Sequence, residues 1–298
     1  LGFERYWCAE HHGMEGIASA ATSVVIGHVA AATSTIRVGA GGIMLPNHSP
    51  LVIAEQFGTL EALFPGRIDL GLGRAPGSDQ RVAAALRRNL DTNPDAFPRD
   101  VVELQSYLAG DGRTGIKATP GAGAKVPLYI LGSSLFGAQV AAVLGLPYAF
   151  ASHFAPQALD DALAIYRERF EPSDVLSEPY AICGYNVFAA DTEEEAHLLA
   201  SSMQQSFVRL RTGQPGKLPP PVEGYRESLP QQAAAMLDGV LKATAIGTPA
   251  QVREQMQAFV DRTKADELII AGSIYDHEKR KRSLTLAAEA FASEPAAA

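Results

Sequence analysis

The stretch Arg5-Tyr-Trp-Cys-Ala-Glu-His-His12 decides how the rest of this chain is interpreted. It is followed by Ile36-Arg-Val-Gly-Ala-Gly-Gly-Ile-Met-Leu-Pro46 and by Gly66-Arg-Ile-Asp-Leu-Gly-Leu-Gly-Arg74. Each stretch is an apolar run, typical of a buried strand, that ends in residues able to carry chemistry: Glu-His-His, a Gly-Gly pair and a lone Arg. Because active sites of α/β barrels lie at the carboxyl ends of their strands, these three stretches predict one site at the mouth of a barrel.

Length and composition fit one large domain. An α/β barrel takes about 250 residues, and this chain has 298, of which 47% are hydrophobic. Its net charge of -8 argues against nucleic acid or an anionic membrane as a partner, because both favour basic surfaces. We therefore expect a single domain over residues 1–298 with neither kind of partner.

The cysteines and the uncharged stretch bear on location and assembly. Cys8 and Cys183 lie in apolar runs without a partner for a redox or metal motif, as is typical of reduced thiols in a cytoplasmic protein. No signal peptide is visible. The stretch between Glu15 and Arg37 carries no charge, but His28 and several hydroxyls make it a poor membrane helix. A helix apolar on nearly all faces instead indicates burial between subunits, so we expect a homodimer.

Strand-like and helix-like patterns alternate along the chain, which favours a parallel sheet with crossover helices. A barrel needs a strand and a helix before the first strand seen here, so we expect about one βα unit to precede this numbering. Strands are predicted at residues 6–11, 36–45, 67–73, 127–131, 148–152, 180–189 and 268–271. Helices are predicted at residues 18–34, 51–64, 134–144 and 156–170, in a region ending near residue 108, from Asp191 and Thr248 onward, and up to residue 292.

Residues 213–235 interrupt this alternation with a segment rich in Pro and Gly. Insertions of this kind on barrels form binding loops or lids, or simply lack regular structure. The sequence leaves both interpretations open.

The other common α/β architecture is a doubly wound sheet with G-x-G-x-x-G after a strand. Here Gly71-Leu-Gly-Arg-Ala-Pro-Gly places Pro76 at the third glycine, where close helix packing requires glycine. This spacing argues against a dinucleotide fold, and the sequence predicts a TIM (β/α)8 barrel.

The Glu-His-His group has two interpretations from spacing alone. Glu10, His11 and His12 cannot all face the barrel interior, because consecutive strand residues point to opposite faces. One histidine could be packed while another caps a loop. A metal site would need a third ligand. His48, His153 and Asp69 are available, but no metal-ligand spacing such as H-x-H or H-E-x-x-H connects them, so we expect no metal.

As a set, these strands resemble the bacterial-luciferase-like flavin monooxygenases, a family of TIM-barrel enzymes. The resemblance is strongest over residues 2–76 and 128–154. It implies that the first histidine of the pair, His11, faces a flavin, that Glu10 orients the site and that His12 is structural. Enzymes of this family react reduced FMN with oxygen, and histidine suits that work because it can donate or accept a proton near neutral pH.

The Gly41-Gly42 pair lies at the end of a strand, where glycine weakens pairing. The residues themselves leave open a β-bulge or the close approach of a ligand. The resemblance implies a non-prolyl cis peptide between Gly41 and Gly42, beneath the flavin ring.

A phosphate site is indicated by Leu131-Gly-Ser-Ser-Leu-Phe-Gly137, where a strand runs through small residues into a helix. Ser133, Ser134 and the backbone N–H groups up to Gly137 could hold the FMN phosphate, although Gly-Ser-Ser alone also fits a simple helix cap. The family resemblance assigns the positive charge to Arg74. Ser133 stands where the family has an acidic residue.

Five further residues have weaker assignments. His153, at the end of the strand that includes Ala149, is a candidate to line the pocket, and so is Asn47 or His48 in the loop after Pro46. In the family pattern a histidine stands one place later than His48, so the resemblance itself assigns His48 no role. Arg67 and Asp69 lie at the N-terminal end of their strand, where barrel residues usually serve stability.

The sequence therefore predicts a monooxygenase that uses reduced FMN and O2 on a small organic substrate. No nicotinamide motif is visible, so a separate NAD(P)H flavin reductase is expected to supply the reduced cofactor. Two alternatives stay open: an F420-dependent dehydrogenase that transfers hydride on the same barrel, and a non-catalytic flavin-binding protein.

Overall fold

The centre of the molecule is an eight-stranded parallel sheet. It is seen in a computed structural model that describes residues 1–74, 80–86 and 96–292. The strands from β1 to β7 follow one another in chain order, and β8 pairs with β6. They are β1 Arg5–Cys8, β2 Arg37–Met44, β3 Ile68–Gly73, β4 Leu128–Gly132, β5 Tyr148–Phe150, β6 Ala181–Ala189, β7 Thr244–Gly247 and β8 Glu267–Ala271.

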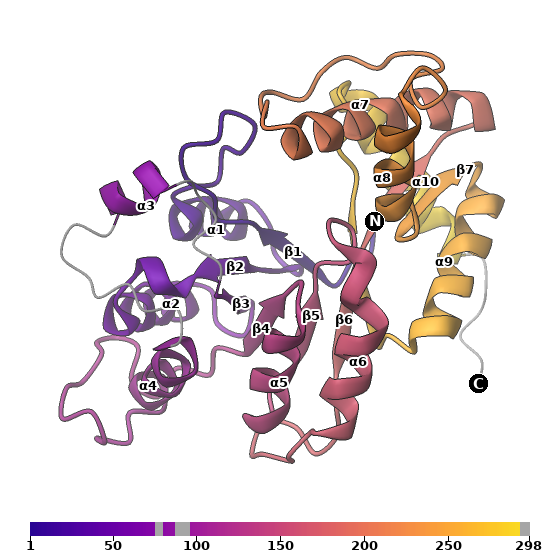
Figure 1. Ribbon diagram of the computed structural model, residues 1–298. Coiled ribbons are helices and arrows are strands. Elements are labelled where there is room, and N and C mark those ends of the chain that lie inside the picture. Colours follow the sequence, from indigo (N-terminus) through magenta and orange to yellow (C-terminus); the bar gives the residue numbers. More distant parts are fainter. Residues whose placement is uncertain (75–79, 87–95, 293–298) are drawn as a thin grey trace.

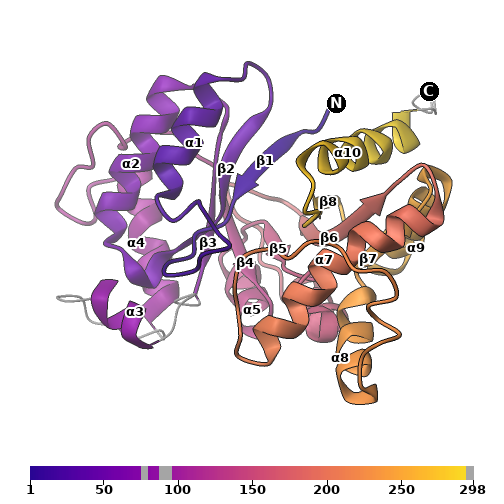
Figure 2. The ribbon, with the colours of Figure 1, turned by 90° about the horizontal axis from the view of Figure 1, so that it is seen from above.

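Helices cover the outside of the curled sheet (Figures 1 and 2). They are α1 Thr22–Ala31, α2 Pro50–Leu63, α3 Gln80–Leu86, α4 Phe97–Ala109, α5 Leu135–Val143, α6 Leu159–Glu168, α7 Glu193–Arg211, α8 Gln231–Leu241, α9 Pro249–Thr263 and α10 His277–Ala292. Local chemistry fixes several helix starts. Thr192 caps α7 by accepting the N–H of Glu195, and Thr248 and Gln251 form a capping box at α9.

The two edges of the sheet, β1 and β8, are joined through side chains. Within the described residues β1 forms a ladder only with β2, and β8 only with β6. Arg5 of β1 donates from Nε to Oε1 of Glu267 in β8 at 2.6 Å, and from Nη2 to Oε2 at 3.0 Å. The edges therefore face each other, and the parallel α/β architecture that the sequence predicts is confirmed.

Apolar side chains pack on both faces of the sheet, as expected when successive strand residues point to opposite sides. The large cluster between sheet and helices includes Ile68, Leu70 and Leu72 of β3. A smaller cluster fills the opposite, interior face. It consists of Tyr129, Ala149 and Ile182, with Trp7, Leu131, Tyr180 and Ile269 packed against it. Trp7 thus lies inside the barrel.

Most predicted elements are present, with ends shifted by a few residues, but three predictions need correction. The irregular segment ends at residue 230 rather than 235, because Gln231–Leu241 forms α8 and its Ala-rich sequence has high helix propensity. The short strand β7 was not predicted. β5 ends at Phe150, so His153 lies in the loop beyond it. The region predicted as helical up to residue 108 contains α3 and α4, and residues 75–79 and 87–95 lie outside the described ones.

The uncharged stretch after Glu15 forms α1, a helix of 10 residues. In the part of the chain that the structure describes, no helix combines the length and hydropathy needed to cross a bilayer.

Candidate functional site

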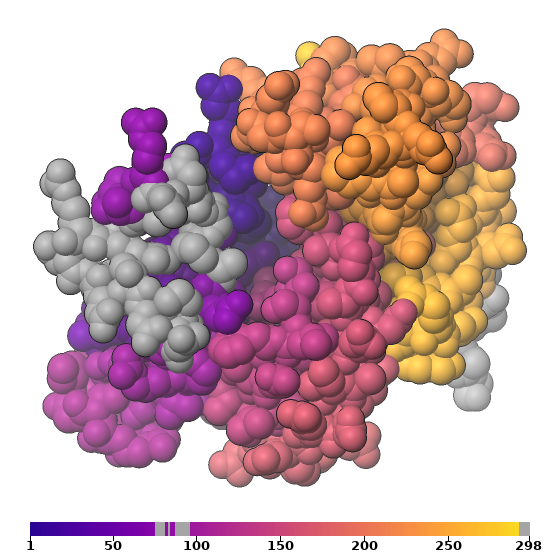
Figure 3. Space-filling model, in the orientation of Figure 1, coloured from indigo at the N-terminus to yellow at the C-terminus, as the bar shows by residue number. Residues whose placement is uncertain are grey.

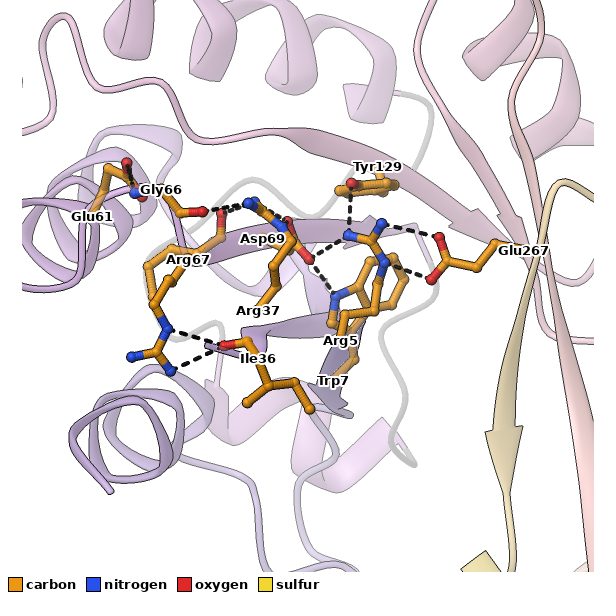
Figure 4. A network of polar contacts seen from close by, with 11 residues as sticks. Arg5, Trp7, Ile36, Arg37, Glu61, Gly66, Arg67, Asp69, Tyr129 and Glu267 are labelled. Atoms are coloured by element: carbon orange, nitrogen blue, oxygen red, sulfur yellow. Dashed lines mark hydrogen bonds and ion pairs between the residues drawn. The ribbon is translucent and has the colours of Figure 1, made fainter. Parts of the chain in front are cut away.

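The N-terminal end of the barrel holds a dense network of charges (Figure 4). Asp69 is fully buried. It accepts hydrogen bonds from Nη1 of Arg5 at 2.8 Å, from Nε of Arg37 at 2.9 Å and from Nε1 of Trp7 at 3.0 Å. Arg5 also binds Glu267 across the sheet edges. Each of these charges has an opposite charge as a direct partner, which suits a structural role.

Arg67 lies at the same end and binds backbone rather than a ligand. Its guanidinium donates to the carbonyl oxygens of Ile36, Ala30 and Thr33, so it ties the end of α1 to the start of β2. The structural roles predicted for Arg67 and Asp69 are therefore confirmed.

The opposite end of β1 carries a different cluster, centred on Glu10, which is 1% exposed. Oε1 of Glu10 lies 2.6 Å from Nε2 of His12 and 2.7 Å from Nε2 of His48, and the N–H of Met44 donates to Oε2 at 2.9 Å. β1 ends at Cys8, so the alternation of a strand no longer governs these residues. One carboxylate thereby orients two imidazoles and ties the loop after β1 to the end of β2.

The charge state of Glu10 follows from its partners. Burial alone would favour the neutral acid. The hydrogen bond and charge of His48, with hydrogen bonds from His12 and the Met44 N–H, outweigh burial and hold the pKa of Glu10 below its ordinary value. Glu10 is therefore a carboxylate at neutral pH, and each imidazole presents an N–H to it.

The same three side chains bring atoms of metal-ligand type within 4.8 Å of one another. Sequence spacing did not reveal this group, because His48 comes from a different strand end. The N···O distances of 2.6 and 2.7 Å are hydrogen-bond distances, whereas ligands about 2.1 Å from a tetrahedral ion lie about 3.4 Å apart. The imidazoles would have to move outward to hold an ion, so we interpret the group as a hydrogen-bonded cluster.

His11 follows Glu10 directly and is half-buried. The structure thus places it in the loop at the C-terminal end of β1, between two residues of the cluster. The sequence offered Asn47 or His48 as a candidate to line the pocket, and the structure places His48 in this group. The one signal in the sequence was that His48 follows soon after a predicted strand, where site residues of a barrel are found.

The predicted glycine pair forms part of the interior wall. The peptide bond between Gly41 and Gly42 is cis, as the family resemblance implies, and the pairing of β2 with β3 shifts register between Ala40 and Ile43. An added Cβ at Gly41 would lie 2.9 Å from Cβ of Trp7, and one at Gly42 would lie 2.7 Å from the backbone oxygen of Gly71. No side chain larger than hydrogen fits at either position.

The predicted phosphate site is assembled from two strand ends. Ser133 and Ser134 are exposed before α5, and Ser134 is an extended N-cap whose side chain makes no capping hydrogen bond. The guanidinium carbon of Arg74 lies 4.2 Å from the ring centroid of Phe136 in the first turn of α5. Gly137 is buried in the same helix. A cation, two hydroxyls and a helix N-terminus therefore meet at one place.

His153 borders the interior from the β5 side. An added Cβ at Gly184 would lie 2.0 Å from its Nδ1, so the imidazole fills the space that this glycine leaves open. Asn186, which sequence analysis missed, donates to the backbone oxygen of His153 at 2.7 Å. Nδ1 of His153 is buried and has no hydrogen-bond partner among the described residues. Burial lowers the pKa of His153 to about 4, which keeps the ring neutral.

These groups lie on the neighbouring strands β1 to β5 or in the loops that follow them. Figure 3 shows a hollow bounded by the N-terminal segments, the β4–α5 region and the segment after α7. All of the groups come from the C-terminal ends of strands, which is where ligands bind in parallel α/β barrels.

Comparisons with known proteins agree with this geometry. The family model described as luciferase-like monooxygenase matches residues 1–266. A luciferase-like monooxygenase of Escherichia coli (strain K12) is 53% identical over 287 residues, which cover 96% of this chain and 86% of that protein.

Two further proteins are similar over nearly the whole chain. The crystal structure of apo-MsnO8 has a TM-score of 0.87 and 36% sequence identity, covering 99% of this chain and 89% of that one. The N-acetyl-S-alkylcysteine monooxygenase of Bacillus subtilis (strain 168) is 32% identical over 305 residues, which cover 97% of this chain and 88% of that protein.

Proposed function

The chain belongs to the luciferase-like monooxygenase family, and from this premise we propose that it is an FMN-dependent monooxygenase that oxygenates a small organic molecule with O2. The observation that carries the proposal is that the Arg74 guanidinium, the hydroxyls of Ser133 and Ser134 and the start of α5 meet at one place, which suits the phosphate of FMN. Gly41 and Gly42 belong to a neighbouring strand, closely packed against Trp7 and the Gly71 backbone.

The residues that would hold FMN divide into two sets. Ser133, Ser134 and the N–H groups at the start of α5, up to Gly137, would bind the phosphate, with Arg74 neutralising its charge. Gly41 and Gly42 would lie against the ring. When bound in its reduced form, FMN supplies the electrons that activate O2.

The histidine side of the mouth would orient the reacting groups. Glu10 holds His12 and His48 in fixed orientations and thereby fixes the loop that carries His11. We assign His11 the contact with the cofactor, where an imidazole can donate or accept a proton. Glu10 is a positioning residue, because its oxygens are occupied by Met44, His12 and His48.

His153 would complete the wall from the opposite side. Its neutral ring presents an unpaired Nδ1 to the interior, and an unpaired buried nitrogen is costly unless a ligand or water satisfies it. A hydrogen bond to the bound cofactor would supply that partner.

The reduced cofactor would come from a separate NAD(P)H flavin reductase, since the sequence carries no nicotinamide motif. Cys8 and Cys183 are free and buried, which fits our proposal of a cytoplasmic location.

A homodimer is proposed through α1 and α2. Val24 of α1 is 71% exposed, and Val52 and Leu63 of α2 are also exposed. A neighbouring subunit would remove these apolar groups from water. Val24→Glu is expected to yield monomers in sedimentation-velocity ultracentrifugation, and an unchanged dimer would exclude this surface.

The test of the function mixes the protein and reduced FMN, prepared without oxygen, with O2. N-acetyl-S-methylcysteine is the first probe, because a relative acts on compounds of that class by its name. We expect oxygen uptake and a product carrying one added oxygen atom in mass spectrometry. His11→Ala should lower the yield by about a hundredfold, and exposed His197→Ala should not change it.

Oxygen uptake without an oxygenated product from any small-molecule panel would contradict a monooxygenase. Hydride transfer with reduced F420 and no oxygen uptake would favour the dehydrogenase alternative. Binding of FMN without any turnover would favour a flavin-binding protein.

A further inference from the structure

Arg211, the last residue of α7, is held by two aromatic rings. Its guanidinium carbon lies 5.2 Å from the ring centroid of Phe154 and 5.2 Å from that of Phe207. Phe207 is buried in α7, whereas Phe154 belongs to the loop after β5 and is 41% exposed. The cation therefore joins the end of α7 to a loop at the mouth of the barrel.

The position of Arg211 relative to the proposed site follows from its neighbours. Phe154 comes directly after His153, whose ring fills the space above Gly184. Beyond Arg211 the chain crosses toward the loop after β1, where an added Cβ at Gly16 would lie 3.0 Å from the carbonyl oxygen of Gly216. Figure 2 shows the end of α7 and the following segment on the side of the mouth. Arg211 therefore lies at the start of a segment that runs from the loop after β5 to the loop after β1, which carries Glu10.

The charge around Arg211 is unusual for this chain. Residues 196–222 contain Arg209, Arg211 and Lys217 but no Asp or Glu, in a protein with a net charge of -8. In the part of the chain described here, Arg211 forms no ion pair with a carboxylate. The helix dipole accounts for a cation in the last turn of α7, but it does not account for two rings that hold the guanidinium in place. Contact with ring faces leaves the N–H groups in the plane of the guanidinium able to bind an anion.

We propose that Arg211 is an anion-binding residue of the substrate site and that it selects small organic molecules bearing a carboxylate. The inference rests on the proposed function, because it places the substrate at the same mouth. The FMN phosphate is a second source of negative charge there, but Ser133, Ser134 and Arg74 are the residues proposed to bind it. The carboxylate of the substrate is therefore the partner that Arg211 lacks.

The experiment uses pairs of ligands that differ only in charge. N-acetyl-S-methylcysteine and a panel of other thioether carboxylates are compared with their primary amides, by isothermal titration calorimetry on the full chain with and without reduced FMN. The variants are Arg211→Gln, Arg211→Lys and, as a matched control two residues earlier in α7, Arg209→Gln. The affinity for reduced FMN is measured separately in each variant.

The proposal predicts that the wild type binds at least one carboxylate about tenfold more tightly than its amide. Arg211→Gln should reduce this preference below about twofold, Arg211→Lys should keep part of it, and Arg209→Gln should keep all of it. The affinity for FMN should stay unchanged in Arg211→Gln. If no carboxylate is preferred, or if Arg211→Gln retains the preference, the proposal is wrong.

The same measurements distinguish a failure of the proposed function from a failure of this proposal. A carboxylate preference that depends on Arg211 in a protein that does not bind FMN would leave the anion site in place and remove the flavin chemistry. A weaker affinity for FMN in Arg211→Gln, with no effect on carboxylates, would assign Arg211 to the cofactor phosphate instead.

Discussion

The network around Asp69 and the C-terminal mouth differ in how their polar side chains are paired. At the N-terminal end, buried Asp69 accepts hydrogen bonds from Arg5, Arg37 and Trp7, and Arg5 also pairs with Glu267. At the C-terminal mouth, Nδ1 of His153 is buried without a partner among the described residues, and the Ser134 side chain makes no capping bond.

We interpret the paired charges around Asp69 as stabilising the fold, and the groups without protein partners at the mouth as available to a ligand. Buried polar groups without partners cost free energy, so a fold under selection for stability alone would satisfy them, as it does around Asp69. The groups without protein partners at the mouth can gain partners from a ligand or from water. The Glu10 cluster lies between these cases: its hydrogen bonds are complete, and they serve to fix the loop that carries His11.

The largest effect is expected at the N-terminal end. Asp69→Asn keeps the size of the side chain but leaves Arg5 and Arg37 without their buried negative partner, so the free energy of unfolding should fall by about 3–5 kcal/mol. Urea unfolding measures the loss. Asp191→Asn, at the exposed pair with Arg282, is the control and should change little. A loss below about 1 kcal/mol at Asp69 would mean that the network is not structural.

At the C-terminal mouth, we expect the free energy of unfolding to depend on pH through His153. The pKa of His153 is lowered from 6.5 to about 4 by burial, so between these values the unfolded chain binds a proton that the folded protein does not. Stability should therefore fall as the pH drops from 6.5 toward 4, by up to about 3 kcal/mol.

His153→Gln should remove this part of the slope, as measured by urea midpoints across the same pH range. His197→Gln, at an exposed position, serves as the control and should keep the slope. An unchanged slope in His153→Gln would show that His153 is not held as a buried neutral ring.

A smaller loss of stability is expected when a side chain is added at Gly184, next to His153. Gly184→Ala places Cβ 2.0 Å from Nδ1 of His153, and because that neighbour is a side chain the ring can move aside. We expect the free energy of unfolding to fall by about 1–3 kcal/mol and the affinity for FMN to weaken.

Gly239→Ala in α8 is the matched control, because its Cβ would meet Nε2 of Gln157 at 3.4 Å and alanine favours a helix. It should leave FMN binding unchanged. Equal affinity for FMN in Gly184→Ala and the wild type would remove His153 from the cofactor wall.

The sequence predicted the fold well, because the fold follows from local patterns. Alternating apolar runs predicted the parallel sheet, and the same runs predicted that Glu10, the glycine pair and Arg74 lie at or near strand ends. The role of His48 could not be predicted, since its contact with Glu10 depends on the path of the chain after β2. Arg211 was missed for a similar reason: its partner Phe154 is 57 residues away, and only the fold brings the two together.

The most direct test of the central claim, that the mouth binds reduced FMN, is an anaerobic titration that follows the fluorescence of Trp7. Trp7 is the single tryptophan of the chain and lies against Gly41, so a flavin at the proposed site should quench it. We predict saturable quenching in the wild type, a dissociation constant raised about tenfold in Arg74→Gln, and no change in exposed Arg113→Gln. Absence of saturable quenching, or equal dissociation constants in the wild type and Arg74→Gln, would contradict the account.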